Sequence, residues 1–137
     1  SAALRYGDDM VVWTRQPVAE SRVENAELVF AGYGIVAPEY GWNDYAGLDM
    51  RGKIAVVLVN DPGFATQDPK LFTGNAMTYY GRWTYKYEEA LRQGAAGLFV
   101  VHETKPAGYP WEVVRNGSAS QIDLRIEAGN NQRRGAP

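Results

Sequence analysis

The chain has 137 residues, of which 45% are apolar and 22% are charged, and its formal net charge is −2. This balance is typical of one folded domain with a buried core, and it excludes a disordered chain. The basic residues are scattered, which argues against a nucleic-acid-binding face, and no apolar run approaches the roughly 18 residues of a membrane span. We therefore expect residues 1–137 to form a single domain that contacts neither nucleic acid nor membrane.

Three β-prone runs lie in the first half of the chain. Residues 10–14 form the first, and residues 26–30 form the second, which turns at Gly32-Tyr33-Gly34. Residues 53–59 carry the strongest strand pattern, and their unbroken apolar, β-branched character predicts a strand buried on both faces. The residues between them, 38–49, are rich in Gly, Pro, Asn and Asp and are predicted to form a loop.

A helix is predicted over residues 84–93 because its apolar residues recur at helical spacing. The predicted inner face consists of Tyr87, Ala90, Leu91 and Gly94, while Lys86, Glu89, Arg92 and Gln93 point elsewhere. Gly94 suits the left-handed conformation that ends many helices, so we expect the helix to stop there.

The remaining segments in the second half of the chain predict a loop, the helix and then a further strand, in that order. Residues 64–82 are predicted to form a long loop, and residues 97–101 form another buried strand after the helix. This order favours a parallel pair with residues 53–59, joined by a right-handed crossover. Residues 121–127 alternate Ile122, Leu124 and Ile126 with polar residues, which predicts a half-exposed strand.

The residue types needed for catalysis or metal binding are sparse. The chain has no cysteine, and its single histidine, His102, is interpreted as a strand-end residue with a local hydrogen bond. A zinc hydrolase needs several convergent ligands, and a serine hydrolase needs an exposing Gly-x-Ser-x-Gly elbow that this sequence lacks. The acids Asp8, Asp9, Asp44, Asp49, Asp61 and Asp68 show no calcium-loop spacing and are predicted to be solvated. We therefore predict that this chain is not an enzyme and holds no cofactor.

Aromatic residues are concentrated around the start of the predicted helix and recur downstream. Tyrosine and tryptophan mixed with arginine are the composition of interface anchors, although core packing is an equally good reading of the same residues. The candidate docking or binding face consists of Tyr79, Tyr80, Arg82, Trp83, Tyr85, Tyr109 and Trp111.

Five segments in a fixed order carry a resemblance to a known family. They are residues 28–35, 37–45, 49–57, 77–86 and 94–103, and the third and fourth contain Asp-Met-Arg-Gly-Lys-Ile-Ala-Val-Val and Tyr-Tyr-Gly-Arg-Trp. Over about residues 20–118 the chain resembles a protease-associated domain. The particular likeness is to the version inserted in bacterial zinc-dependent exopeptidases of the aminopeptidase and glutamate carboxypeptidase kind.

The resemblance implies an α/β fold, the swivelling β/β/α protease-associated domain, with a mixed, barrel-like sheet and flanking helices. It also implies a non-catalytic accessory domain of a secreted or periplasmic zinc aminopeptidase that shapes substrate access or protein–protein contacts. Zinc would then belong to the parent's catalytic domain, and that domain of the same polypeptide is the expected partner, with peptide substrate as a second one. No signal peptide is visible in this chain, so we expect any export signal to lie upstream. The alternative is a stand-alone peptide- or carbohydrate-binding module.

Overall fold

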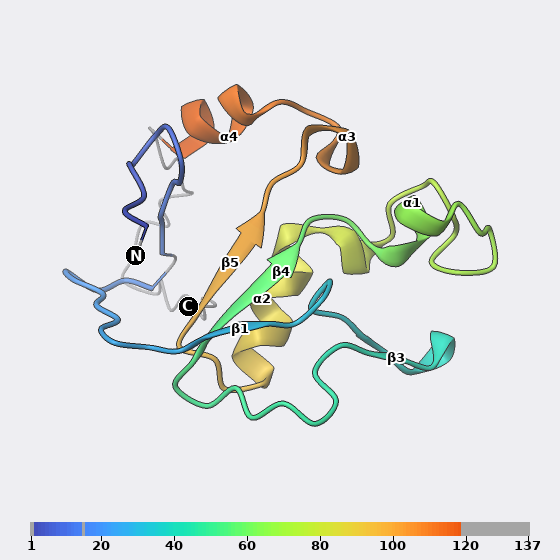
Figure 1. Ribbon diagram of the computed structural model, residues 1–137, viewed down its shortest axis with the longest axis horizontal. Helices are drawn as coiled ribbons and strands as arrows, with labels where there is room; N and C mark the ends of the chain where they lie inside the picture. The colour runs from blue at the N-terminus through green and yellow to red at the C-terminus, as the bar shows by residue number, and fades with distance from the viewer. Residues whose placement is uncertain (1, 15, 119–137) are drawn as a thin grey trace, which may run out of the picture.

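A computed structural model describes residues 2–14 and 16–118 and shows a mixed α/β arrangement with two small sheets (Figure 1). The larger sheet has three parallel strands in the order β1 (Leu28–Phe30), β4 (Ile54–Leu58) and β5 (Gly97–Val101). The smaller sheet pairs β2 (Val36–Ala37) with β3 (Trp42–Asn43) in antiparallel fashion. Within the described residues these sheets do not close into a barrel, in contrast to the barrel-like sheet that we expected.

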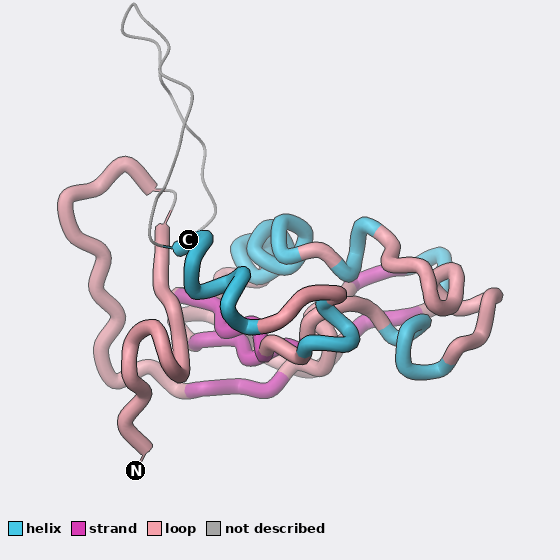
Figure 2. The backbone as a smooth tube through the Cα atoms, turned by 90° about the horizontal axis from the view of Figure 1, so that it is seen from above, coloured by secondary structure: helices cyan, strands magenta, loops and turns pink. Residues whose placement is uncertain are grey.

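One long helix and several short ones accompany the sheets. The helix α2 (Trp83–Arg92) lies along one face of the parallel sheet (Figures 1 and 2). The short helices are η1 (Pro38–Tyr40), α1 (Pro62–Thr66), η2 (Tyr79–Gly81), α3 (Thr104–Ala107) and α4 (Trp111–Ser118). The predicted loops over residues 38–49 and 64–82 therefore contain short regular elements, which apolar periodicity does not reveal at such lengths.

The parallel pair of β4 and β5, connected through α2, confirms the predicted strand–helix–strand order. Gly94 ends the helix as expected: its φ is +80°, and its N–H donates to the carbonyl of Leu91 at 3.0 Å. The N–H of Ala95 reaches back to the carbonyl of Ala90, also at 3.0 Å. Together these two bonds form the motif that glycine favours at helix ends, and they turn the chain directly into β5.

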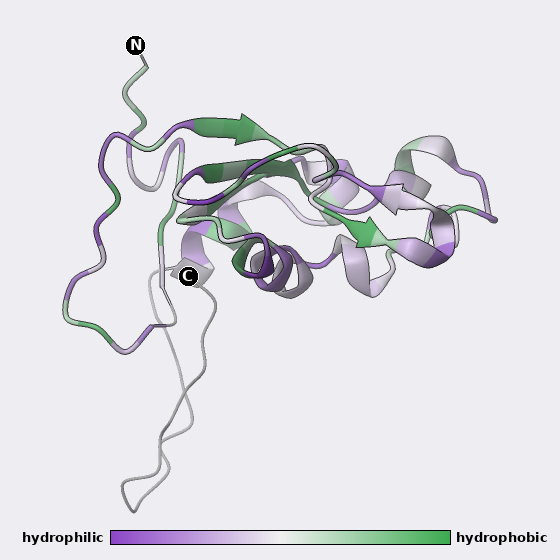
Figure 3. Cartoon of the chain, turned by 90° about the horizontal axis from the view of Figure 1, so that it is seen from below, coloured by the Kyte–Doolittle hydropathy of each residue, from purple (hydrophilic) through white to green (hydrophobic). Residues whose placement is uncertain are grey.

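The main core lies between α2 and the parallel sheet. Ala55 and Val57 of β4 are fully buried, and they pack in one cluster with Ala90 of α2. A second cluster joins the β2–β3 hairpin to the start of α2 through Ile35, Phe72 and other residues. Figure 3 shows that the strands of the parallel sheet are the most hydrophobic continuous part of the chain.

The described residues do not cover the opposite face of the parallel sheet, so within them the prediction that residues 53–59 are buried on both faces is wrong. Ile54, Val56 and Leu58 are only half-buried. Their neighbours on the same face are more exposed still, with 62% of Phe30 and 40% of Val101 accessible to solvent. We call this surface the open sheet face; it consists of Leu28, Phe30, Ile54, Val56, Leu58, Phe99 and Val101.

Two other predictions of secondary structure need comment. Residues 10–14 are not a strand: apart from an isolated bridge between Tyr6 and Met10 this run is irregular, because none of the described strands pairs with it. The strand predicted over residues 121–127 lies outside the described residues.

The buried face of α2 also differs from the predicted one. Its buried residues are Tyr85, Lys86, Glu89 and Ala90, whereas Leu91 is 48% exposed. The prediction assigned Lys86 and Glu89 to the outside because they carry charge. Lys86 is buried because its amine finds two backbone carbonyls inside, and the Glu89 carboxylate is held by Arg92 and Gln93 at the edge of the buried face.

Candidate functional site

The aromatic residues of the predicted docking face fall into two separate series of ring contacts. In the first, Tyr80 meets Tyr85 and Phe72 edge to face, with ring centroids 4.8 and 5.7 Å apart, and Tyr79 meets Tyr85 at 5.9 Å. The second series runs through Trp83, which contacts Tyr109 at 6.0 Å and Trp13 at 5.9 Å. The structure therefore brings Tyr79, Tyr80 and Tyr85 together, and it places Trp83 with Tyr109 in another group.

Trp111 joins the second series through His102, whose ring lies 5.9 Å from the Trp111 ring and 5.5 Å from Tyr109. The indole Nε1 of Trp111 donates to the carbonyl of Gly7 at 3.0 Å, which ties α4 to the N-terminal segment. Trp83, Tyr109 and Trp111 are all half-buried. This second group of aromatic residues thus serves in part to hold the N-terminal segment and α4 together.

Tyr85 is an interior residue, with only 5% of its surface exposed. Its hydroxyl accepts from the Val36 N–H at 3.0 Å and donates to the Val36 carbonyl at 3.1 Å. A single phenol therefore satisfies both backbone groups of one residue of the β2–β3 hairpin. This explains why an aromatic residue with a hydroxyl stands on the inner face of α2.

Tyr79 and Arg82 are the residues of the predicted face that remain most exposed, and Met77 lies next to them in the sequence. Tyr79 is 51% exposed and Arg82 is exposed as well, while Met77 is 38% exposed. Tyr80 is half-buried, and its hydroxyl bonds the Glu39 carboxylate, which raises the pKa of Tyr80 to about 12. We call Met77, Tyr79 and Arg82 the η2 corner.

The backbone of the η2 corner is held from beneath by Asp61, which is fully buried. One oxygen of Asp61, Oδ2, accepts from the Thr78 N–H at 2.9 Å and from the Thr78 hydroxyl at 2.7 Å. The other oxygen, Oδ1, accepts from the N–H of Gly63 at 3.0 Å and caps α1. On the surface, the hydroxyl of Tyr79 bonds both oxygens of Glu88 at 3.0 and 3.1 Å, and this raises the pKa of Tyr79.

The prediction that all loop acids are solvated is therefore wrong for Asp61, and also for Asp44. The carboxylate of Asp44 accepts from the backbone N–H groups of Tyr33 and Ile35, both at 3.1 Å. It clamps the Gly32-Tyr33-Gly34 turn so closely that a Cβ at Gly32 would lie 2.6 Å from an Asp44 oxygen. Both acids replace water by backbone N–H donors, which is how proteins bury carboxylates.

Lys86 completes this buried polar network from α2. It is fully buried, and its amine donates to the carbonyl of Tyr33 at 2.6 Å and to that of Asn60 at 2.9 Å. Burial lowers the pKa of Lys86 from 10.5 to about 7, although the negative charges of Asp44 and Asp61 work against this. A neutral amine still has two hydrogens to donate, so both carbonyls remain satisfied in either protonation state.

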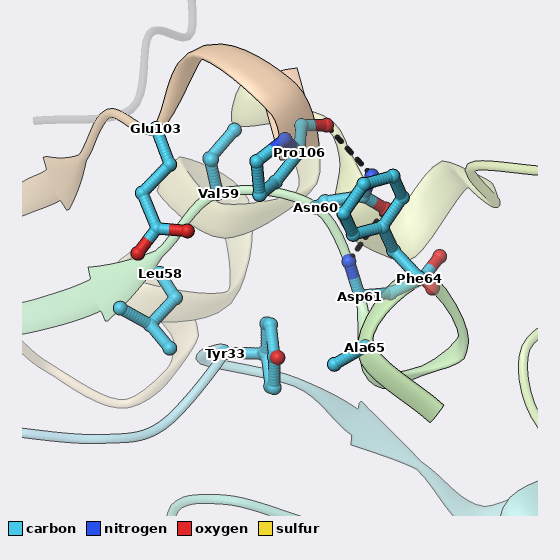
Figure 4. Close-up of a pocket in the computed structure, with 9 residues that line it drawn as sticks. All are labelled: Tyr33, Leu58, Val59, Asn60, Asp61, Phe64, Ala65, Glu103 and Pro106. Carbon is cyan, nitrogen blue, oxygen red and sulfur yellow. Dashed lines mark hydrogen bonds between the residues drawn. The ribbon is translucent and has the colours of Figure 1, made fainter. Parts of the chain in front are cut away.

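A small cavity of about 150 Å³ opens at the carboxyl end of β4 (Figure 4). It is lined by Tyr33, Leu58, Val59, Asn60, Asp61, Phe64, Ala65, Glu103 and Pro106. Asn60 and Asp61 are already engaged, since the Asn60 amide donates to the Pro106 carbonyl at 2.7 Å and its oxygen accepts from the Asp61 N–H. The cavity is smaller than the roughly 300 Å³ at which typical small-molecule sites begin.

His102 does not make the local hydrogen bond that we expected of it. Both ring nitrogens are shielded from solvent and have no hydrogen-bond partner within residues 2–14 and 16–118. The ring instead packs among the rings of Tyr109 and Trp111. The same described residues contain no cluster of three or more His, Asp or Glu side chains arranged to share a metal ion.

Comparisons with other proteins give no further assignment. No family model, no curated protein and no solved structure matches this chain. None of the helices in the described part of the chain has the length and hydropathy that crossing a bilayer requires.

The most important site residues that the sequence did not indicate are Lys86, Asp44 and Asp61. Asp61 carries a usable signal, because an acid directly before Pro62-Gly63 is a typical helix cap. Lys86 has no comparable signal, since its partners are backbone carbonyls that lie 53 and 26 residues away.

Proposed function

We propose that this chain is a non-catalytic protease-associated domain that serves as an accessory domain of a secreted or periplasmic zinc aminopeptidase. The resemblance of the five ordered segments supports this assignment, and the mixed α/β arrangement with a parallel β4–α2–β5 unit is compatible with it. In this proposal the zinc and the chemistry belong to the catalytic domain of the parent, which is the partner of this chain.

The observation that carries an interaction role is the rigid exposure of the η2 corner. Tyr79 and Arg82 present an aromatic ring and a guanidinium to solvent. The backbone beneath them is fixed by the buried carboxylate of Asp61. A surface that is already ordered loses little conformational entropy on binding, and tyrosine and arginine are frequent anchors of interfaces. We therefore propose that the η2 corner contacts the catalytic domain or the peptide entrance.

The alternative, a stand-alone module for peptides or carbohydrates, has less support. The described cavity is small, and two of its polar lining residues, Asn60 and Asp61, are occupied by internal hydrogen bonds. The aromatic rings that such a module would use are divided between two groups rather than forming one platform.

The first test is to sequence the reading frame on both sides of this chain in its source. We expect a continuation that carries spaced His, Asp and Glu ligands of a zinc peptidase. A frame that holds only a signal peptide upstream and ends soon after residue 137 would refute the accessory role.

The second test measures association of the domain with the separately produced catalytic domain by calorimetry. Tyr79→Ala combined with Arg82→Ala should weaken binding about tenfold or more, as the loss of interface anchors does. The matched control is Leu91→Ala with Lys105→Ala, which also removes one exposed apolar and one exposed basic side chain. Equal weakening by both pairs, or saturable binding of short peptides or glycans in place of the catalytic domain, would contradict the proposal.

A further inference from the structure

The open sheet face is a feature of the structure that the proposed function does not use. Its seven residues come from all three parallel strands and are all apolar. Four of them are substantially exposed: Leu28 at 57%, Phe30 at 62%, Phe99 at 37% and Val101 at 40%. The pairing register places Phe30, Val56 and Phe99 side by side, so the exposed groups form one continuous surface.

A parallel sheet with one bare face is unusual. Parallel sheets occur almost only where both faces are covered, and contiguous exposed apolar surface of this kind marks a contact site. Here α2 covers one face, through Ala90 packing on Ala55 and Val57. We therefore expect another element to cover the other face as a second layer.

The described residues of the chain do not supply that layer. The N-terminal segment instead contacts α2 through Trp13 and α4 through the Gly7 carbonyl. Beyond the end of α4 at Ser118, nineteen residues of this chain remain, 119–137. At roughly 3.3 Å per residue they reach about 60 Å when extended, which is ample to cross a three-stranded sheet.

The sequence of that remaining segment is complementary to the open sheet face. Ile122, Leu124 and Ile126 alternate with Asp123, Arg125 and Glu127. In an extended chain this alternation gives one apolar side and one charged side. The apolar side matches the seven apolar residues of the open sheet face, and the charged side would remain in water.

We propose that residues 121–127 dock on the open sheet face as an extended segment, with Ile122, Leu124 and Ile126 against Phe30, Phe99 and their neighbours. Both elements belong to this chain, so the inference stands independently of the proposed function. Docking completes the second layer of the domain and removes its apolar surface from solvent.

The test compares two triple variants of the full chain in urea unfolding. Ile122→Ser, Leu124→Ser and Ile126→Ser together should raise the unfolding equilibrium constant by about tenfold or more, as expected for the loss of buried aliphatic groups. The control changes Asp123, Arg125 and Glu127 to serine and should leave that constant within about threefold of the wild-type value. Equal effects of the two triple variants would overturn the proposal.

A proximity measurement keeps the proposal testable if the apolar triple variant does not fold. The chain has no cysteine, so pairs can be introduced cleanly. Leu28→Cys with Leu124→Cys should give a short-range cross-link within one molecule, several-fold faster than the control pair Leu28→Cys with Arg125→Cys. Cross-links that form only between molecules would show that a second copy covers the face, and absence of any cross-link would also overturn the proposal.

Discussion

Replacing Tyr85 by phenylalanine would remove one oxygen atom and leave the ring in place. The ring contacts with Tyr80 at 4.8 Å and Tyr79 at 5.9 Å would persist, so packing is largely unchanged. The hydroxyl, however, bonds both the N–H and the carbonyl of Val36, at 3.0 and 3.1 Å. The same hydroxyl also makes a longer contact of 3.4 Å with a Glu89 carboxylate oxygen. The variant therefore measures mainly the contribution of one phenol to the attachment of the β2–β3 hairpin to α2.

The expected loss in the free energy of unfolding follows from the two backbone groups of Val36 that lose their partner. A buried polar group left unsatisfied costs about 1–3 kcal/mol. Val36 is half-buried, so water compensates for part of the loss. We expect Tyr85→Phe to lower the free energy of unfolding by about 2–3 kcal/mol, which lies at the lower end of the range for two groups.

Tyr45 supplies a matched control within the same chain. It is also buried, at 3% exposure, but its hydroxyl has no hydrogen-bond partner among the described residues. Burial accordingly raises the pKa of Tyr45. Tyr45→Phe removes an unsatisfied polar atom and should be neutral or should stabilise the protein by about 1 kcal/mol.

The assay is urea unfolding of both variants and the wild type, followed by tryptophan fluorescence and far-UV circular dichroism, with linear extrapolation to water. The expected order of stability is Tyr45→Phe at or above the wild type, and Tyr85→Phe clearly below it. If Tyr85→Phe lost no more stability than Tyr45→Phe, the assignment of the Val36 backbone bonds to Tyr85 would be refuted.

Three further predictions follow from other buried groups. Because folding lowers the pKa of Lys86 from 10.5 to about 7, the unfolded state binds more protons between these values, so stability should rise with pH. The rise from pH 7 to 9.5 should be about 3 kcal/mol in urea titrations and should be absent in Lys86→Met; an equal slope in that variant would contradict the assignment. His102→Phe should raise the melting temperature, because it removes two ring nitrogens that have no hydrogen-bond partner among the described residues, at a gain of about 1–2 kcal/mol; a loss of stability would show that they have partners. Gly34→Ala should lower the free energy of unfolding several times more than Gly41→Ala does. Both glycines have positive φ, but only at Gly34 would an added Cβ meet Val57, at 2.7 Å. Similar denaturation midpoints for the two alanine variants would refute that steric argument.

Local sequence signals predicted much of the backbone. Residues 53–59 and 97–101 correspond to the paired strands β4 and β5, and the helical spacing before Gly94 located α2 within about one residue at each end. Gly94 itself was predictable because only a residue tolerant of positive φ ends a helix in this way. These signals depend on neighbours a few positions apart, and such neighbours are visible in any sequence.

The prediction for the candidate site was less complete, and Tyr85 illustrates why. The sequence indicated that this residue belongs to an aromatic-rich segment with two possible uses, packing or docking. The structure places Tyr85 in the interior and Tyr79 on the surface, although the two rings contact each other. Composition alone does not separate them, because exposure depends on which way the helix turns toward the hairpin.

The sequence by itself determined the order of elements, the helix stop and the sparseness of catalytic residue types. Tertiary structure decided which charged groups are buried. Lys86 lies inside because the carbonyls of Tyr33 and Asn60 converge on one point, and these residues are far apart along the chain. It also decided that the parallel sheet has one covered and one open face, which an unbroken apolar run does not reveal. The physical reason is common to both: apolar periodicity records local preference, whereas the desolvation of a charge or of a sheet face is balanced by groups that only the folded chain brings together.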